Sequence, residues 1–278
     1  MGRLPPSRCC CGEGQGRRRM AEARVTKVSV IGCGSFGQLV LRSIAPHVDV
    51  TCYDADRSTL REIDYPMAMD CASAAAADIV VLAVPVQAIE EVLRAIAPHL
   101  RASALVVDVC SVKRKPLAAM ARLLPSHCEI LGTHPLFGPQ SALRGLAGSG
   151  IALVPVRGRQ WRRVAAFLEK ALHLDVIVTT AERHDRDMAY VQGLTHMLAR
   201  VVGQMRLPTT PLTTRTYDHM LSMVGLVGQD SDALFEAIMA ENPYSAAVYD
   251  EFVGQFTKLR DLVNGFDIIP LRQKAEQE

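Results

Sequence analysis

The chain has 278 residues and a formal net charge of +2, which is enough length for one large domain or two modest ones. Residues 1–20 carry a local charge of +4, which leaves −2 for the remainder and gives no support for nucleic-acid binding. No apolar run approaches the ~18–20 residues that a membrane-spanning helix needs. The composition is therefore typical of a globular protein that works in water.

The N-terminal segment and the cysteines indicate a cytoplasmic protein. Residues 1–24 are rich in proline and glycine and have no apolar signal-peptide core, so we expect a disordered tail, with Met20 as a natural start. Three of the eight cysteines lie in this tail, and the others are scattered through apolar segments without any Cys-x-x-Cys spacing. This usage suits a reducing cytosol and predicts neither a disulfide framework nor a metal site.

The stretch Lys27 to Gly37 predicts a first β-strand that turns tightly into a helix. Its apolar run opens into Gly-x-Gly-x-x-Gly, where the first glycine permits the turn, the second lets backbone approach a pyrophosphate, and the third lets the helix lie against the sheet. The alternative is a tight turn without a ligand. The expected cofactor-binding residues here are Gly32, Gly34, Ser35, Phe36 and Gly37.

The second apolar run, Val48 to Tyr53, ends at Asp54, 22 residues after Gly32. At a separation of roughly 20 residues an acidic side chain can accept both ribose hydroxyls of a dinucleotide. A carboxylate there would repel the 2′-phosphate of NADP, so we expect NAD to be preferred. Arg57 lies close enough to soften that preference, which leaves NADP possible.

Strand and helix then alternate along the chain. We expect a helix over Phe36–Ala45, a short helical segment over Arg57–Glu62, and a short strand near Met67 before an alanine-rich helix. The apolar run from Asp78 to Pro85 predicts a strand covered on both faces, and Val84 near its end is a further expected cofactor contact. The next expected elements are helix Val86–Ile96, strand Ala104–Asp108, helix Lys113–Leu124 and strand Glu129–Thr133.

This alternation predicts an α/β fold with a doubly wound (Rossmann) parallel sheet over residues 25–180. Two further strands, Ile151–Val154 and Val176–Thr179, flank a helix over Arg159–Leu172 and should extend the sheet. From Ala181 onward apolar residues recur at three- and four-residue intervals, which predicts an all-helical domain over residues 181–278. By analogy with other two-domain enzymes, this domain would bind substrate and form a homodimer.

Polar residues gather where strands of the predicted sheet end, which is where open parallel sheets bind ligands. Ser111 and Lys113 follow the strand that ends at Asp108, and His134 follows another strand in what we expect to be a turn. His134 is a candidate catalytic base, with an ordinary structural histidine as the alternative. Lys113 could contact a phosphate or carboxylate, or simply begin a helix.

On the predicted helix of the second domain, Gln192 and His196 are four residues apart and should share one face. They could face a substrate, or form a polar pair inside a helix–helix contact.

Together these blocks resemble the prephenate/arogenate dehydrogenases of tyrosine biosynthesis, and most closely the plant arogenate type. The matching blocks are the glycine turn; Asp108-Val-Cys-Ser-Val-Lys113; Thr133-His-Pro-Leu-Phe-Gly-Pro139 with Ser141; His184-Asp185 with Gln192 and Thr195-His196; and Thr214-Arg-Thr-Tyr217 through Asp230-Ser231 to Asn242. The resemblance implies oxidative decarboxylation of arogenate to tyrosine, or of prephenate to 4-hydroxyphenylpyruvate, with hydride transfer to a nicotinamide.

The resemblance also implies roles for single residues. His134 would hold the substrate hydroxyl, and Ser111 would lie beside it and help to orient the substrate. Gln192 and His196 would face the substrate from the helical domain, and Thr133 belongs to the same substrate-binding set.

Two further positions concern the substrate's charged groups. Bacterial prephenate enzymes have a carboxylate-binding arginine where this chain has Gly225-Leu226, so Arg215 is the expected substitute. In the plant-type family an acidic residue at the position of Asp230 goes with arogenate use and tyrosine sensitivity, because a carboxylate pairs with the ammonium of both molecules. We therefore favour arogenate, with tyrosine feedback possible; alternatively, Asp230 caps the next helix.

Two other functions remain as alternatives. A 3-hydroxyacid dehydrogenase or a pyrroline-carboxylate reductase would share the fold, but those families lack the Thr-His-Pro-x-Phe-Gly-Pro block, and the former use a lysine where this chain has His196. A non-catalytic NAD-binding regulator would be favoured by loss of His134 or Ser111, and both are present.

Overall fold

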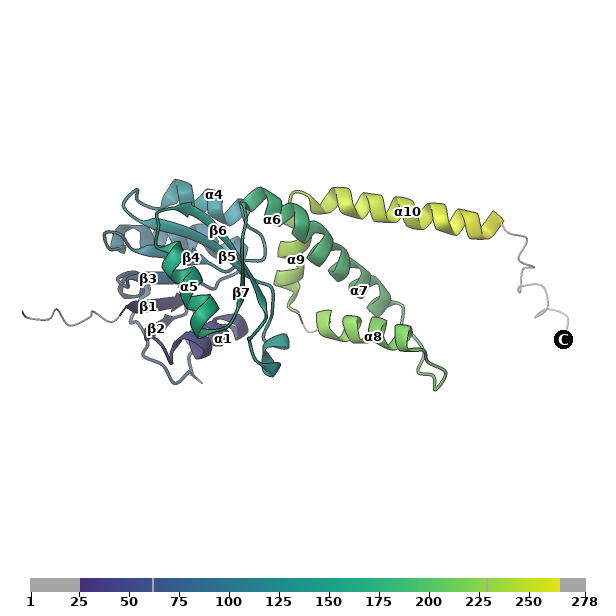
Figure 1. Cartoon of the computed structure of the whole chain (residues 1–278), viewed down its shortest axis with the longest axis horizontal. Helices are drawn as coiled ribbons and strands as arrows, with labels where there is room; N and C mark the ends of the chain where they lie inside the picture. Colours follow the sequence, from purple (N-terminus) through teal and green to yellow (C-terminus); the bar gives the residue numbers. More distant parts are fainter. Residues whose placement is uncertain (1–25, 62, 229, 266–278) are drawn as a thin grey trace, which may run out of the picture.

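The computed structural model describes residues 26–61, 63–228 and 230–265 (Figure 1). The expected tail over residues 1–24 and the end of the expected helical domain, residues 266–278, lie outside this described part of the chain.

Seven strands form one sheet in the order β2-β1-β3-β4-β5-β6-β7 (Figure 1). This confirms the predicted Rossmann-like α/β fold. Every neighbouring pair is parallel, as predicted, except β5 and β6, which pair in antiparallel orientation. The chain returns from β5 to β6 through the short 3₁₀ helix Ser141–Arg144, and without a crossover helix the returning strand runs antiparallel. The strands are β1 Lys27–Ile31, β2 Asp49–Tyr53, β3 Ile79–Leu82, β4 Leu105–Asp108, β5 Glu129–Pro135, β6 Gly150–Arg157 and β7 Asp175–Val178.

Helices cover both faces of the sheet. Residues of α1 and α5 pack in one apolar cluster on one face, and residues of α2, α3 and α4 pack in a second cluster on the other. The helices are α1 Ser35–Ile44, α2 Cys71–Ala75, α3 Ile89–Ile96, α4 Arg114–Leu123 and α5 Trp161–Ala171, with short 3₁₀ turns at Val86–Ala88 and Ala97–His99.

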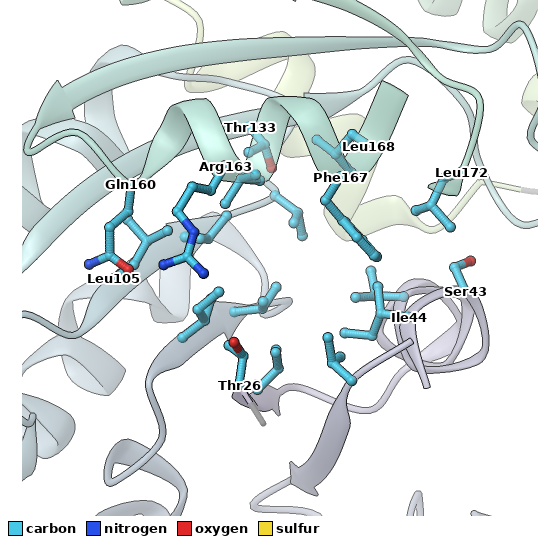
Figure 2. Close-up of a pocket in the computed structure, with 18 of the residues that line it drawn as sticks. Thr26, Ser43, Ile44, Leu105, Thr133, Gln160, Arg163, Phe167, Leu168 and Leu172 are labelled. Atoms are coloured by element: carbon cyan, nitrogen blue, oxygen red, sulfur yellow. The ribbon is translucent and has the colours of Figure 1, made fainter. Parts of the chain in front are cut away.

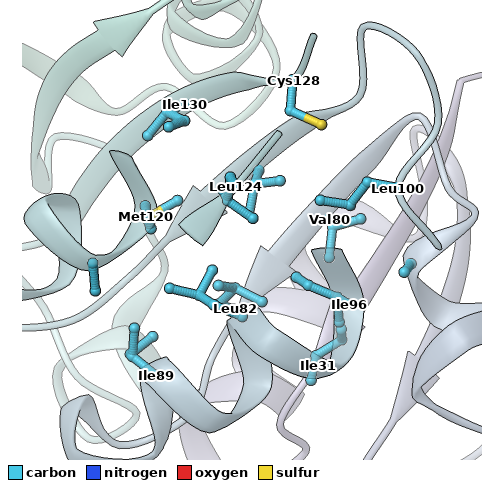
Figure 3. Packing of buried hydrophobic residues seen from close by; sticks show 14 of the residues in the cluster. Ile31, Val80, Leu82, Ile89, Ile96, Leu100, Met120, Leu124, Cys128 and Ile130 are labelled. Carbon is cyan, nitrogen blue, oxygen red and sulfur yellow. The ribbon is translucent and has the colours of Figure 1, made fainter. Parts of the chain in front are cut away.

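The second cluster shows why these segments are helices (Figure 3). In α3, Ile89, Leu93 and Ile96 recur at helical spacing and each is at most 1% exposed. They pack under Val80 and Leu82 of β3, which are fully buried. Burying each such side chain stabilises the fold by about 1.5–3 kcal/mol.

On the opposite face a cavity of about 710 Å³ lies between α1, the sheet and α5 (Figure 2). Apolar side chains of the sheet such as Val81 and Leu105 line it, together with Phe167 of α5. Thr133 and Pro135 also line it, and because alternate strand residues face opposite sides, His134 between them points to the other face. This cavity is therefore separate from the site around His134.

After β7 the described chain is helical, as predicted. Helix α6, a π-helical turn and α7 lead away from the sheet, and α8, α9 and the long α10 follow (Figure 1). In the described residues no helix combines the length and the apolar content that crossing a membrane would take. The elements are α6 Ala181–Met188, the π-helix Ala189–Leu194, α7 Thr195–Gln204, α8 Arg215–Val227, α9 Asp232–Ala240 and α10 Ser245–Gly265.

Two short predicted elements differ from the structure. Residues 57–61 form turns instead of a helix, because the Asp56 side chain accepts from the Ser58 backbone N–H at 2.9 Å and stabilises a turn. The strand expected near Met67 is a single bridge to Cys52.

Candidate active site

The glycine turn has the geometry that a dinucleotide requires. Gly32 has φ +98°, and a Cβ there would lie 2.3 Å from the Ala83 carbonyl oxygen. A Cβ on Gly37 would lie 1.9 Å from the Gly32 carbonyl oxygen, so helix and turn touch backbone to backbone. A Cβ on Gly34 would meet nothing within 4 Å, which leaves open space at the point where phosphates would approach.

The N-terminus of α1 is free to receive an anion. Gly34 is its N-cap and supplies no side-chain hydrogen bond, so the first N–H groups of the helix point outward unsatisfied by a cap. Ser35 is exposed beside them and Phe36 is half-buried. This chain's own residues therefore fit the pyrophosphate of a dinucleotide.

Asp54 lies beside the same turn. Its Oδ2 accepts from the Cys33 backbone N–H at 2.6 Å and its Oδ1 from the Asp56 N–H at 2.9 Å. Val84 also borders the turn, since its Cγ1 is 2.9 Å from the position of a Cβ on Gly32. Arg57 is exposed and donates to the Met69 carbonyl at 2.6 Å, so it is held near the end of β2.

His134 lies inside β5, paired with Ala152 of β6, so the expectation of a turn at this residue is wrong. The antiparallel return of β6 extends β5 to Pro135 and fixes the backbone of the histidine in the sheet. The side chain is 3% exposed. Burial lowers the pKa of His134 well below its ordinary value, and the neighbouring His184 and Lys113 lower it further.

A chain of hydrogen bonds runs from His134 into the helical region. His134 Nδ1 lies 2.8 Å from His184 Nε2, and His184 Nδ1 lies 2.8 Å from Asp185 Oδ1. The Asp185 carboxylate in turn accepts from the backbone N–H groups of Lys113 at 2.7 Å and Arg114 at 2.9 Å, where α4 begins. Helix α6 is thereby fastened to the Rossmann domain.

Lys113 lies beneath the site and is fully buried. Its Nζ forms an ion pair with Asp108 Oδ1 and donates to the Thr133 carbonyl at 2.6 Å. The Thr133 hydroxyl donates to the Asp108 carbonyl at 2.7 Å. Burial raises the pKa of Asp108, and Lys113 counters the shift. Lys113 is thus committed to an internal pair at the start of α4, with no free ammonium for a phosphate.

Gln192 reaches His134 from the π-helical turn. Its Nε2 lies 3.3 Å from His134 Nε2, and its buried Oε1 has no partner among the described residues. Such π turns are frequent at functional sites because they displace side chains from regular helical positions. The unpartnered oxygen gives this amide a free acceptor beside the histidine.

His196 and Asp230 form a second polar group, on the helical side of the site. His196 Nε2 lies 3.7 Å from Asp230 Oδ2, and the buried His196 Nδ1 has no partner in the described chain. Burial lowers the pKa of His196 and raises that of Asp230, while each charge opposes the shift of the other. The alternative that Asp230 caps α9 is wrong, because Ser231 is the N-cap and its Oγ accepts from the Leu234 N–H at 3.2 Å.

The two remaining predicted site residues, Ser111 and Arg215, lie in different parts of the structure. Ser111 is half-buried in the loop from β4 to α4, two residues before Lys113 and thus next to the anchor of Asp185. Arg215 is exposed at the start of α8, the end of that helix that points away from the sheet (Figure 1). Within one chain it is not brought together with His134.

His184 and Asp185 carried no assigned role from sequence alone. Helix α6 is almost entirely charged, and its spacing does not show that these two residues are buried at 3% and 0% exposure. The sequence offered one signal, the adjacent His-Asp pair within a block of family resemblance.

The fold and site define a two-part protein, a dinucleotide-binding domain whose strand-end histidine meets a helical region. Two family models match it: "Prephenate dehydrogenase, nucleotide-binding domain" over residues 38–179, and "Prephenate dehydrogenase, dimerization domain" over residues 180–276. The chain belongs to the prephenate dehydrogenase family.

Individual relatives agree with this membership. A probable arogenate/prephenate dehydrogenase of Methanocaldococcus jannaschii is 30% identical over 68% of this chain, and arogenate dehydrogenase 2 of Arabidopsis thaliana is 29% identical over 83%. The chain spans 44% of the length of the first relative and 68% of the second.

Solved structures share the fold. The prephenate dehydrogenase of Aquifex aeolicus, in complex with hydroxyphenyl propionate and NAD⁺, superposes with a TM-score of 0.69 at 19% identity, covering 86% of this chain and 91% of its own. The Synechocystis arogenate dehydrogenase superposes with a TM-score of 0.62 at 20% identity, covering 86% of this chain and 93% of its own.

Proposed function

We propose that this chain is an NAD-dependent arogenate dehydrogenase, which converts arogenate to tyrosine by oxidative decarboxylation. The observation that carries the proposal is His134, a buried histidine whose Nε2 faces the Gln192 amide at the edge of a dinucleotide-binding sheet. The family membership supports the same reaction class.

His134 acts as the proton acceptor. The substrate hydroxyl becomes a carbonyl as hydride leaves its carbon, so its proton needs a base. Because burial depresses its pKa, His134 is neutral at physiological pH and can accept that proton on Nε2. When the ring carboxylate departs as carbon dioxide, the ring oxygen becomes a phenolate and takes the proton back from His134.

The glycine turn and Asp54 hold the cofactor, which supplies a nicotinamide as the hydride acceptor when bound. Asp54 favours NAD because its carboxylate, already placed at the turn, accepts ribose hydroxyls and repels a 2′-phosphate. Arg57 donates to the Met69 carbonyl, which reduces its capacity to attract that phosphate.

The helical side binds the rest of the substrate. Gln192 Oε1 and His196 Nδ1 are buried and unpartnered among the described residues, so they can bond to polar groups of a ligand. Asp230 pairs with the ammonium of arogenate, which prephenate lacks, and the same pairing lets tyrosine act as a feedback inhibitor. Ser111 completes the strand side, whereas the Thr133 side chain faces the opposite cavity, so Thr133 acts only indirectly, through its carbonyl bond to Lys113.

The protein works as a homodimer. Along α10 an apolar stripe, Val253, Phe256, Leu259 and Leu262, is 57–61% exposed on each residue, in the region matched by the dimerization-domain model. Arg215, exposed at the start of α8, stays the proposed partner of the substrate carboxylate. Sedimentation of the chain, and of its Leu259→Glu variant, tests the dimer.

The experiment that tests the function is steady-state kcat/KM with arogenate and with prephenate, each against NAD and NADP. The proposal expects arogenate with NAD to be the best pair by at least about 10-fold, the effect of one charge-assisted hydrogen bond. Equal use of both substrates would make it a broad cyclohexadienyl dehydrogenase. No turnover of either would contradict the proposed activity.

A further inference from the structure

We propose that His184 and Asp185 are positioning residues for His134, and that the three form a hydrogen-bonded relay that leaves His134 Nε2 as the proton acceptor. The inference rests on the proposed function in one respect, that His134 is the base. The direction of donation in its hydrogen bonds, however, is a property of the ligand-free protein and can be measured without substrate.

The relay begins at Asp185, which is fully buried. Both of its oxygens accept backbone N–H groups, Oδ1 from Lys113 at 2.7 Å and Oδ2 from Arg114 at 2.9 Å. These donors lie at the N-terminus of α4, where a helix favours negative charge. An ionised carboxylate only accepts, so the His184 Nδ1 at 2.8 Å from Oδ1 carries the proton.

The position of this proton also fixes the direction of the hydrogen bond between His184 and His134. With a single proton, placed on Nδ1 by Asp185, His184 keeps a lone pair on Nε2, and that atom lies 2.8 Å from His134 Nδ1. His134 therefore donates from Nδ1 and keeps an acceptor at Nε2. The amide nitrogen of Gln192, 3.3 Å from Nε2, is a donor to that lone pair in the ligand-free protein.

The relay matters because His134 has to become positively charged in an unfavourable place. It is 3% exposed, and the buried ammonium of Lys113 lies close enough to oppose a second positive charge. When the substrate hydroxyl gives its proton to Nε2, the Nδ1–H bond to His184 strengthens, and Asp185 compensates the new charge through it. The proton returns to the ring oxygen from the same atom.

The relay is also mechanically fixed. The Asn242 side chain donates to the Asp185 carbonyl at 2.7 Å, so the helix that carries both relay residues is held from a second side. Such indirect contacts commonly set the tautomer and ring orientation of a functional histidine.

The test combines a spectroscopic signature with kinetics. In the ligand-free wild-type protein, long-range ¹⁵N–¹H correlation of the imidazoles should show His134 protonated on Nδ1 and bare on Nε2. The variant His184→Phe keeps a ring but removes the acceptor; kcat should fall about 10²-fold, the scale of general base catalysis, while KM changes less than about 3-fold. His184→Gln, whose amide oxygen can still accept from His134, should recover much of kcat.

A matched control is His219→Phe, because His219 is an exposed histidine on α8; it should leave kcat and the His134 signal unchanged. The relay is overturned if wild-type His134 carries its proton on Nε2. It is equally overturned if His184→Phe keeps wild-type kcat, or loses kcat while the His134 tautomer stays the same. Should His184→Phe not fold, the wild-type tautomer and His184→Gln decide the question.

Failure of the proposed function gives a different result. If the wild-type protein turns over neither arogenate nor prephenate, the activity is wrong, yet the tautomer of His134 still shows whether the relay exists.

Discussion

On the strand side of the site, His134, Thr133 and Lys113 are buried and each has its side-chain hydrogen bonds made, whereas on the helical side Gln192 and His196 each keep a buried polar atom unpartnered among the described residues. The strand side is fixed in the sheet, where β5 pairs with parallel β4 on one edge and antiparallel β6 on the other. The helical side is built from the π-helical turn and from α8 and α9. Asp230 lies between these two helices and is half-exposed.

The difference separates two tasks. A group that exchanges a proton benefits from a surrounding that is already organised before substrate arrives, because no bonds have to be rearranged during the reaction. A surface that recognises a substrate needs free donors and acceptors, and a buried unpaired polar atom is costly until a ligand pairs with it. The strand side is therefore expected to govern kcat, and the helical side KM and substrate choice.

The largest expected effect follows from removing the base. The variant His134→Asn should lower kcat by about 10²–10⁴-fold, because it deletes the proton acceptor while an amide of similar size fills the space. NAD affinity, measured by quenching of protein fluorescence, should stay unchanged, since the glycine turn is untouched. A near-normal kcat in this variant would show that another group accepts the proton.

A substitution on the strand side should also lower the stability of the folded protein. The variant Lys113→Met leaves Asp108 as a buried charge without its partner, so the free energy of unfolding in urea should fall by about 3–5 kcal/mol. Lys115→Met is the matched control on the same helix: its ion pair with Glu241 is half-exposed, so it should cost less than about 1 kcal/mol. If both variants lose the same free energy of unfolding, the buried pair of Lys113 contributes no more than an exposed one.

On the helical side a single charge should change substrate choice. The variant Asp230→Asn should lower kcat/KM for arogenate by about 10- to 100-fold through loss of a charge-assisted hydrogen bond to the ammonium, and leave prephenate unaffected or improved. Asp232→Asn is the control, since that side chain is 95% exposed and paired with Arg200. If both variants treat the two substrates alike, the ammonium binds elsewhere.

The smallest expected effect concerns pH. Because the pKa of His134 is depressed in the folded protein, kcat/KM should stay level as pH falls to the ordinary histidine value of about 6.5 and decline only below it. Stability follows the same sign: the unfolded chain binds the proton more readily, so the contribution of neutral His134 is complete above pH ~6.5 and is lost as pH falls towards the folded pKa. An acid limb above pH 7 would mean that another group controls the rate.

Much of the fold could be predicted because its signals are local. The glycines of the turn, the apolar strand runs and the helical spacing of α3 each reflect a backbone preference or a burial pattern within a few residues. One failure, the turn expected at His134, has a cause that is not local. Whether β6 runs parallel or antiparallel, and so whether His134 lies in a turn or a strand, depends on pairing with residues almost twenty positions away.

The amino-acid sequence by itself determined a dinucleotide-binding Rossmann domain, a helical C-terminal region and His134 as the candidate base. Only the tertiary structure decided what surrounds that histidine. Two of the bonds that orient it join residues 50 and 72 positions apart, from His134 to His184 and from Asp185 to Lys113. Such contacts form when separate layers pack, and because they depend on burial and direction, no spacing along the chain encodes them.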